Sequence, residues 1–133
     1  MGSFIYARRA AFVEGFVPIF RKFFEFLSEG REEAGIDYNS ALHNADFALL
    51  LEQALDKDRL LQHTSVGIHK DDLTFKLSGY PVKKFGSQGQ QKSFLTALKL
   101  AQFEYIKSVK KIKPMLLLDD VFDKLDEHRL SRL

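Results

Sequence analysis

Apolar residues in the first part of the chain recur three and four positions apart. This spacing runs from residue 4 to residue 27 and predicts an amphipathic helix, which Pro18 is expected to kink or divide. A short extended segment at residues 35–38 and a second helix at about residues 45–62 are expected to follow. The N-terminal half of the chain is therefore predicted to be mainly helical.

The period of the pattern changes after residue 70. Apolar and polar residues alternate from residue 73 to residue 77, and Ser78-Gly79 supplies a turn, so a β-hairpin or an edge pair is expected here. A loop at residues 85–89 then leads into a long helix, because the apolar positions between residues 94 and 105 return to helical spacing. The last turns of this helix are rich in lysine.

A continuous apolar run at residues 115–118 follows Pro114 and leads directly into two carboxylates. A run without alternation is typical of a strand buried on both faces of a parallel sheet. The expected fold class is therefore mixed α/β, in the order helical arm, hairpin, helix and buried strand. We predict two regions, a helical arm at residues 1–63 and a second lobe at residues 64–133.

Composition narrows the class without giving a function. The chain has 133 residues, of which 45% are apolar and 29% charged, as expected for a globular protein. It has no cysteine, which excludes disulfides and thiolate metal sites and favours a reducing, cytoplasmic location. No apolar run is long enough to cross a membrane, and no secretory signal is recognised at the N-terminus. The net charge of +2 is too small to indicate nucleic-acid binding by itself.

The loop around Ser87 is the first candidate for chemistry. Small and polar residues, Ser87-Gln88-Gly89-Gln90, lead straight into a helix, where free N–H groups of the first turn can hold an anion. The alternative is a plain helix start that Ser87 caps, with Gln91 as the partner in a capping box. The loop by itself leaves both interpretations open.

The carboxylates after the apolar run are the second candidate. Asp119 and Asp120 would lie at the C-terminal edge of a sheet, where open α/β folds bind ligands. One of them could enter a Mg²⁺ shell and the other could orient an attacking water. The alternative is a strand that ends in a polar turn. The conjunction is more specific than either part, because the loop, the helix and the strand follow in the order and spacing used by ABC-type ATPases.

These segments resemble the RecF family of DNA replication and repair proteins. The resemblance rests on residues 85–92, 97–101 and 116–126, and the element at residues 67–72 is similar to the family's G-P-H-[RK]-D-D element, with Ile68 in place of the proline. It covers nearly the whole chain. None of the eight glycines is followed by lysine, so there is no Walker A phosphate loop in this sequence, and we expect a fragment of a longer protein.

The resemblance implies that ATP with Mg²⁺ is sandwiched between two protomers, each completing the other's site. It implies nucleotide contacts for the signature loop, a Mg²⁺ ligand and a catalytic carboxylate after the strand, and a further residue at the dimer seam. The nucleotide contacts fall on Ser87, Gln88, Gly89 and Gln90. The Mg²⁺ ligand is Asp119, the catalytic carboxylate is Asp120, and the residue at the dimer seam is Asp126. Without a phosphate loop, the fragment alone is expected to be inactive as an ATPase.

The resemblance also implies partners. RecF-like proteins form homodimers that bind DNA near junctions of single and double strands, at gaps and stalled forks, and act with RecO and RecR in recombinational repair, replication and the SOS response. Lysines at residues 83–84 and 107–113 either contact DNA phosphates or form a solvated helix end.

Two other functional classes stay open from the sequence. One is the head of another ABC-type DNA machine, such as an SMC or Rad50 protein, although the chain lacks long heptad runs. The other is a helical interaction module with no nucleotide role. A metal cluster at His69, Asp71 and Asp72 is disfavoured, because adjacent loop residues rarely converge on one ion.

Overall fold

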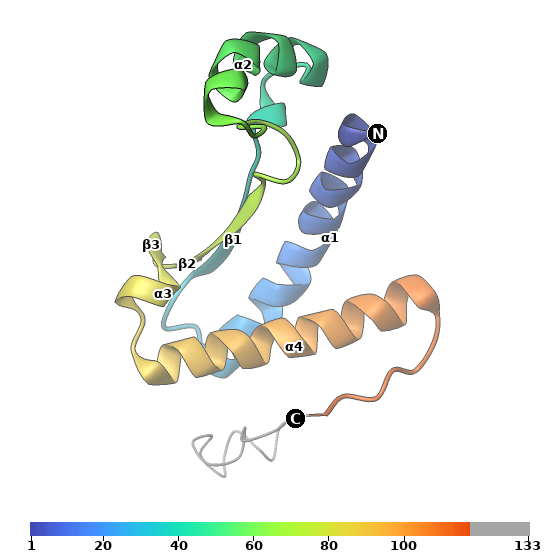
Figure 1. The fold of residues 1–133 in the computed structure, drawn as a ribbon. Helices are drawn as coiled ribbons and strands as arrows, with labels where there is room; N and C mark the ends of the chain where they lie inside the picture. Colours follow the sequence, from blue (N-terminus) through green and yellow to red (C-terminus); the bar gives the residue numbers. More distant parts are fainter. Residues whose placement is uncertain (118–133) are drawn as a thin grey trace. The chain divides into compact units, whose positions relative to one another are not determined.

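The computed structural model describes residues 1–117, which form four helices of the α type, one short 3-10 helix and a three-stranded sheet (Figure 1). The strand order is β1-β2-β3. In chain order the elements are α1 (Gly2–Ser28), β1 (Ala34–Asn39), η1 (Ala41–His43), α2 (Phe47–Leu61), β2 (Asp72–Leu77), β3 (Tyr80–Pro81), α3 (Val82–Phe85) and α4 (Gln88–Lys110). Each helix and strand expected between residues 4 and 105 is therefore present.

Helix α1 runs through Pro18 without interruption. Its buried stripe consists of Phe16, Phe20, Phe24 and Leu27, which recur at the spacing of one helix face. Pro18 lies on the exposed side, and packing of the buried stripe around it offsets the one lost backbone hydrogen bond. The prediction of an amphipathic helix is confirmed. Pro18 does not divide the helix, and the alternative that it kinks the helix stays a prediction.

The chain divides into two compact units, each built from two separate stretches of sequence. Of the described residues, unit 1 consists of 1–14 and 36–74, and unit 2 consists of 15–35 and 75–117. Helix α1 and strands β1 and β2 each contribute residues to both units. The division into residues 1–63 and 64–133 made from the sequence stays a prediction.

The core of unit 2 is an aromatic cluster formed by α1 and α4. Phe94 of α4 lies 4.7 Å from Phe20 and 5.7 Å from Phe24, measured between ring centroids. Phe75 of β2 packs edge-on against the same Phe94 ring at 5.7 Å. Further along α4, the small residues Ala97 and Ala101 are fully buried. The Phe-rich stripe of the first helix is thus core, as helical spacing favours.

Polar and aromatic contacts link α1, β1 and η1 in unit 1. Tyr6 stacks on Tyr38 at 6.0 Å, and His43 meets both rings edge-on. The same histidine contacts the Tyr6 hydroxyl through Nδ1 at 2.9 Å and the Tyr38 carbonyl through Nε2 at 2.6 Å. Helix α2 begins at a cap in which Asp46 accepts hydrogen bonds from the backbone N–H groups of Ala48 and Leu49.

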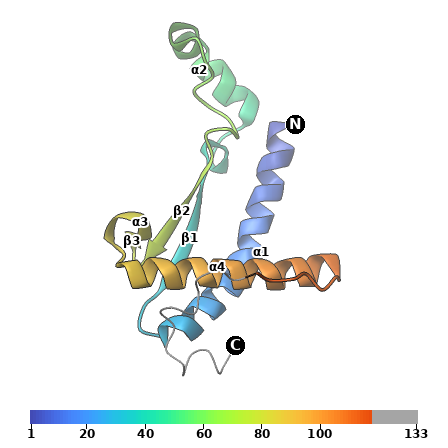
Figure 2. The same cartoon turned by 60° about the horizontal axis from the view of Figure 1, so that its bottom comes forward.

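The hairpin expected after residue 72 is present. Strands β2 and β3 are antiparallel, with Lys76 opposite Pro81 and Leu77 opposite Tyr80. Ser78 and Gly79 both have positive φ values, 48° and 85°, as a type I′ turn requires. Figures 1 and 2 show β1 running beside β2. The hairpin places α3, and the loop that follows it, next to the start of α4.

The strand expected at residues 115–118 is not found in the described part of the chain. Residues 115–117 have no regular structure, and the side chains of Met115 and Leu117 are 93% and 88% exposed. A strand buried on both faces needs neighbouring strands on each side. The β1-β2-β3 sheet of residues 1–117 provides none for this segment, so the prediction is wrong for its described part. Leu118 lies outside the described residues.

Candidate functional site

The Ser87 loop forms a complete capping box at the start of α4. The Ser87 Oγ accepts a hydrogen bond from the Gln90 backbone N–H at 3.2 Å, and the Gln90 Oε1 accepts one from the Ser87 backbone N–H at 2.6 Å. The partner predicted from the sequence was Gln91, which is wrong. Counting from the cap residue, the third helical position is Gln90, and only that side chain reaches back to the Ser87 N–H.

Two further contacts hold the loop from its other side. Gln91 donates from Nε2 to the Gly86 carbonyl at 2.8 Å, and the Gly86 N–H donates to the Val82 carbonyl at 2.9 Å. Gly86 approaches α3 so closely that an added Cβ would lie 2.7 Å from the Val82 carbonyl oxygen. The loop conformation therefore depends on a glycine at position 86.

Replacing this glycine by alanine tests that dependence. We expect Gly86→Ala to lower the free energy of unfolding by about 1–3 kcal/mol, because backbone atoms must move to relieve the clash. Gly89→Ala is the matched control, since the nearest atom to its added Cβ is 4.0 Å away. That control should be neutral or stabilising by up to about 1 kcal/mol, because alanine favours helix. Urea denaturation of both variants makes the comparison, and equal stabilities would contradict it.

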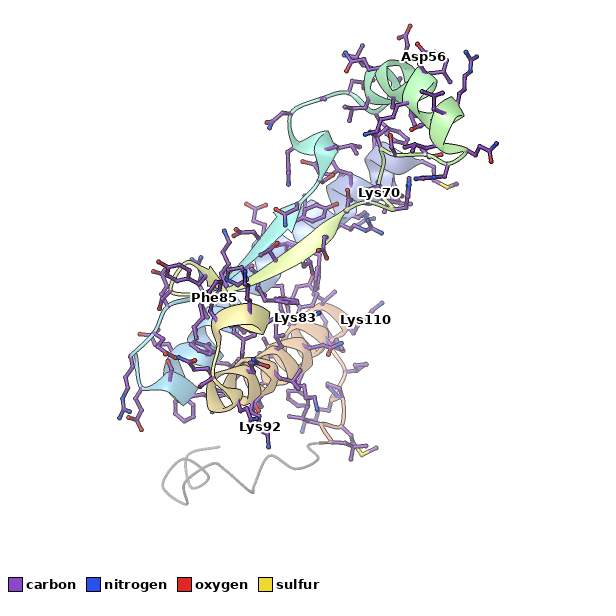
Figure 3. All side chains as sticks on the ribbon, turned by 60° about the vertical axis from the view of Figure 1, so that its left-hand side comes forward. Asp56, Lys70, Lys83, Phe85, Lys92 and Lys110 are labelled. Carbon is purple, nitrogen blue, oxygen red and sulfur yellow. The ribbon has the colours of Figure 1, made fainter. Side chains whose placement is uncertain are left out.

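The loop is open to solvent and electrostatically suited to an anion. Ser87, Gln88 and Gly89 are exposed, and the first turn of α4 contains no acidic residue. A 23-residue helix carries partial positive charge at this end. Lys83 and Phe85 on the preceding α3, and Lys92 in the next turn of α4, lie around the loop in Figure 3.

The Ser87 hydroxyl keeps its donor in this arrangement. Its oxygen accepts the hydrogen bond from the Gln90 N–H, while a hydroxyl also carries one O–H donor. Capping and anion binding are therefore compatible at Ser87. The two interpretations that the sequence left open do not exclude each other.

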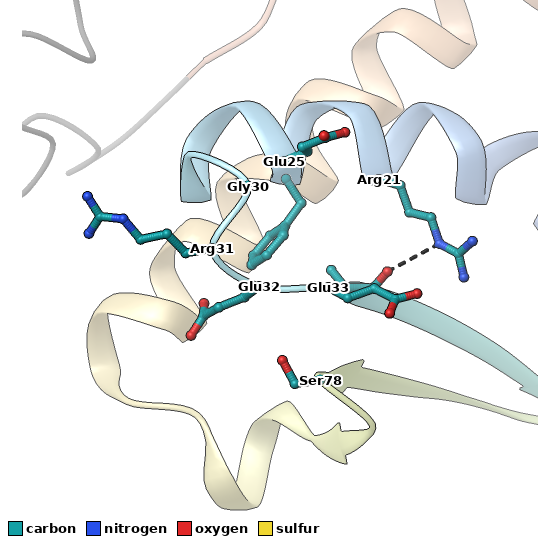
Figure 4. Close-up of a pocket in the computed structure, with 9 residues that line it drawn as sticks. Arg21, Glu25, Gly30, Arg31, Glu32, Glu33 and Ser78 are labelled. Carbon is teal, nitrogen blue, oxygen red and sulfur yellow. Dashed lines mark hydrogen bonds between the residues drawn. The ribbon is translucent and has the colours of Figure 1, made fainter.

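Gln90 also links the loop to the turn between α1 and β1. Its Nε2 donates to the Glu32 carboxylate, which is partly buried. Glu32 borders two cavities in unit 2. One, of about 220 Å³, also touches Tyr80, Phe85 and Gly86. The other, of about 380 Å³, is lined by residues of the α1–β1 turn together with Arg21 and Ser78 (Figure 4).

The carboxylates of the predicted site lie outside the described residues. Asp119, Asp120 and Asp126 belong to residues 118–133, so their roles as Mg²⁺ ligand, catalytic carboxylate and dimer-seam residue stay predictions. Of the predicted site, the structure brings together Ser87, Gln88, Gly89 and Gln90 in one loop and helix start. Within residues 1–117, no group of three or more histidine, cysteine or acidic side chains could hold a metal ion.

Asp71 in unit 1 is a buried carboxylate with a structural set of partners. Its side chain is 2% exposed, and Oδ2 accepts hydrogen bonds from the Tyr38 hydroxyl and from Arg9 Nη1, the latter at 3.1 Å. Burial opposes ionisation, but the hydrogen bonds from Tyr38 and Arg9, together with the interaction with Ser40 and the charge of Arg9, outweigh it and hold the pKa of the Asp71 carboxyl below its ordinary value. Burial and the neighbouring Asp71 raise the pKa of the Tyr38 hydroxyl.

Similar contacts hold the loop at residues 67–72 in place. His69 Nε2 forms a hydrogen bond with the Thr64 carbonyl at 3.0 Å, and Arg9 Nη1 donates one to the Ile68 carbonyl at 2.6 Å. The loop therefore ties α1 to β2 within unit 1. Sequence reasoning missed Arg9 and Tyr38 as partners of Asp71, because nothing in the local pattern marks residues so distant in the chain as neighbours.

Known proteins similar to this chain are RecF proteins. No protein-family model matches the chain. The protein described as DNA replication and repair protein RecF of Flavobacterium johnsoniae is 50% identical over 99% of this chain and 37% of its own length. That of Bacteroides thetaiotaomicron is 43% identical over 99% of this chain and 36% of its own length. Over nearly its whole length, the chain is therefore similar to RecF proteins.

Solved RecF structures share its architecture. One described as the recombination mediator protein RecF with ATP in the RecFOR pathway has a TM-score of 0.81 and 31% identity, and one with ATPrS has 0.80 and 29%. They cover 98% and 96% of this chain. The mixed helix and sheet class is confirmed. The chain spans about 37% of the length of these RecF relatives.

Helices α1 and α4 are long, but among residues 1–117 no helix combines the length and apolar character that a bilayer crossing requires.

Proposed function

We propose that this chain supplies the signature half of an ATP site in a RecF-type DNA repair and recombination protein. The observation that carries the proposal is the exposed, fully capped Ser87 loop at the N-terminus of α4, in a chain that shares its fold with a RecF structure described with ATP. The loop offers a hydroxyl donor and the positive end of a helix to a phosphate group. The residues present therefore fit ATP.

In this function the chain's own residues bind and orient. Ser87 donates a hydrogen bond from its hydroxyl to a phosphate oxygen. The backbone around Gly89 faces the same phosphate group, and Gln88 and Gln90 border it. Hydrogen bonds to a charged oxygen contribute more than neutral ones do. One such loop cannot enclose a nucleotide, so the proposal includes a second protomer that supplies the phosphate loop. ATP supplies the binding energy that joins the two.

The acidic residues complete the proposed site. Asp119 is proposed as a ligand of Mg²⁺, Asp120 as the carboxylate that orients water for hydrolysis, and Asp126 as a residue of the dimer seam. These assignments rest on the resemblance of residues 116–126 to the RecF family. The partners proposed with them are DNA at single-strand to double-strand junctions, RecO and RecR, in cytoplasmic repair at gaps and stalled forks.

Two substitutions at Ser87 separate capping from phosphate binding. Ser87→Ala should lose the cap, about 1 kcal/mol of stability, and also the phosphate contact. Ser87→Asp should keep the cap, because aspartate is a good cap residue, but place a negative charge against the phosphate. We expect both to weaken self-association driven by a non-hydrolysable ATP analogue at least tenfold. Light scattering on the protein read from the complete gene measures it.

The control is Ser108→Ala at the other end of α4, which removes a hydroxyl bonded to the Tyr105 carbonyl. It should leave nucleotide-driven association unchanged. Association of Ser87→Asp at the wild-type level would contradict the proposal. A gene that encodes no G-x-x-x-x-G-K-[ST] loop would contradict it as well, because the site then has no phosphate-binding half.

A further inference from the structure

The Gln90 side chain is held at both ends of its amide. Its Oε1 accepts from the Ser87 backbone N–H at 2.6 Å, and its Nε2 donates to the Glu32 carboxylate. Glu32 lies in the turn between α1 and β1, some sixty residues earlier in the chain. A residue from the turn that follows α1 thus contacts the loop that is proposed to face ATP.

The chemistry of this pair gives it a direction. An ionised carboxylate only accepts hydrogen bonds, so Glu32 requires that the NH₂ end of Gln90 face it. The oxygen of the amide must then face Ser87, whose N–H needs an acceptor. A reversed amide would set two donors against each other at Ser87 and two acceptors against each other at Glu32. Glu32 therefore selects the amide orientation that completes the capping box.

We propose that Glu32 is a positioning residue for the signature loop. It fixes the Gln90 amide, which fixes the Ser87 backbone and so aims the Ser87 hydroxyl. The consequence for nucleotide binding rests on the proposed function of the Ser87 loop, whereas the consequence for the loop itself does not. Because Glu32 belongs to the α1–β1 turn, a shift of that turn would also loosen the loop.

A reciprocal exchange of the two side chains tests the proposal. Glu32→Gln removes the requirement for one amide orientation, and Gln90→Glu sets two carboxylates against each other. In the double variant, the carboxylate introduced at position 90 accepts from the Ser87 N–H and from the amide introduced at position 32. The bridge from the turn to the Ser87 N–H is thereby restored, with a carboxylate in place of the central amide. Both singles should lose order at Ser87, and the double should regain it.

Amide hydrogen exchange of Ser87 in this chain is the first readout. We expect exchange to be about fivefold to tenfold faster in Glu32→Gln, faster still in Gln90→Glu, and within about twofold of wild type in the double variant. Glu33→Gln is the matched control, because it removes the same charge from an exposed neighbouring position. Unchanged Ser87 exchange in both single variants, or no recovery in the double variant, would overturn the proposal.

Nucleotide-driven association of the protein read from the complete gene is the second readout. Its strength should fall about tenfold in each single variant and recover in the double variant, at unchanged thermal stability of the rest of the fold. A merely structural contact would give exchange effects without an effect on association, and that result would also overturn the positioning role. If even Ser87→Asp left association unchanged, the proposed function would fail, while the exchange data would still decide whether Glu32 orders the loop.

Discussion

Phe94→Ala should lower the free energy of unfolding by about 3–5 kcal/mol, the range observed when a buried phenylalanine is truncated. Phe94 is 2% exposed, and its ring contacts Phe20, Phe24 and Phe75. Truncation would open a cavity at the point where α1, β2 and α4 meet in unit 2. Such a loss is a large share of the stability of a domain of this size. Urea denaturation followed by circular dichroism measures it.

The neighbouring Leu95 provides the control for this substitution. Its side chain is 53% exposed on the same helix. Leu95→Ala should change stability by no more than about 0.5 kcal/mol, because little apolar area is lost and alanine favours helix. If both variants lost stability equally, the aromatic cluster would not be the core of unit 2.

Asp71→Asn should lower the free energy of unfolding by about 2–3 kcal/mol at neutral pH, because hydrogen bonds to a charged group contribute about 1.5–3 kcal/mol and a buried group that loses them is costly. The substitution keeps the shape of the side chain but removes the charge that receives hydrogen bonds from Tyr38 and Arg9. Urea denaturation measures the loss. Asp72→Asn is the control, because Asp72 is exposed and its carboxylate bonds only the next N–H in the chain.

The same substitution predicts a pH dependence. The pKa of the Asp71 carboxyl is lower in the folded chain than its ordinary value, so folding favours the ionised form. Its contribution is therefore fully present above the pKa of the unfolded chain, about 3.9, and is lost as the pH falls through the lowered folded value. The stability gap between wild type and Asp71→Asn should narrow in acid. A gap that stays constant down to about pH 2 would contradict this.

Local features of the fold could be predicted from the sequence because they depend on local chemistry. The spacing of apolar residues located α1 and α4, and Ser78-Gly79 located the hairpin turn, since glycine readily adopts positive φ. Ser87 could be predicted as the capping residue because capping also depends on local chemistry, although its predicted partner, Gln91, is one position away from the observed Gln90. The prediction of a strand at residues 115–117 is wrong because strand formation depends on neighbouring strands, which a local pattern cannot show.

The contacts that organise the candidate site could not be predicted, because they join residues far apart in the chain. Nothing near Glu32 marks it as a partner of Gln90, and nothing near Arg9 marks it as a partner of Asp71. A charged residue in a turn is usually solvated, so its sequence context gives no signal. Only the pairing of the distant segments in the fold identifies both carboxylates.

The two-stretch construction of each unit has a consequence for how the protein is made. The phenylalanine stripe of α1 is synthesised first, but its partner Phe94 follows roughly seventy residues later. At about 5–20 residues per second, that interval is roughly 4–15 seconds on the ribosome. Throughout it the nascent helix displays the apolar face that later becomes core, which is the kind of surface that chaperones bind and that promotes aggregation. Synthesis at a reduced rate should therefore lower the soluble yield unless a chaperone covers α1.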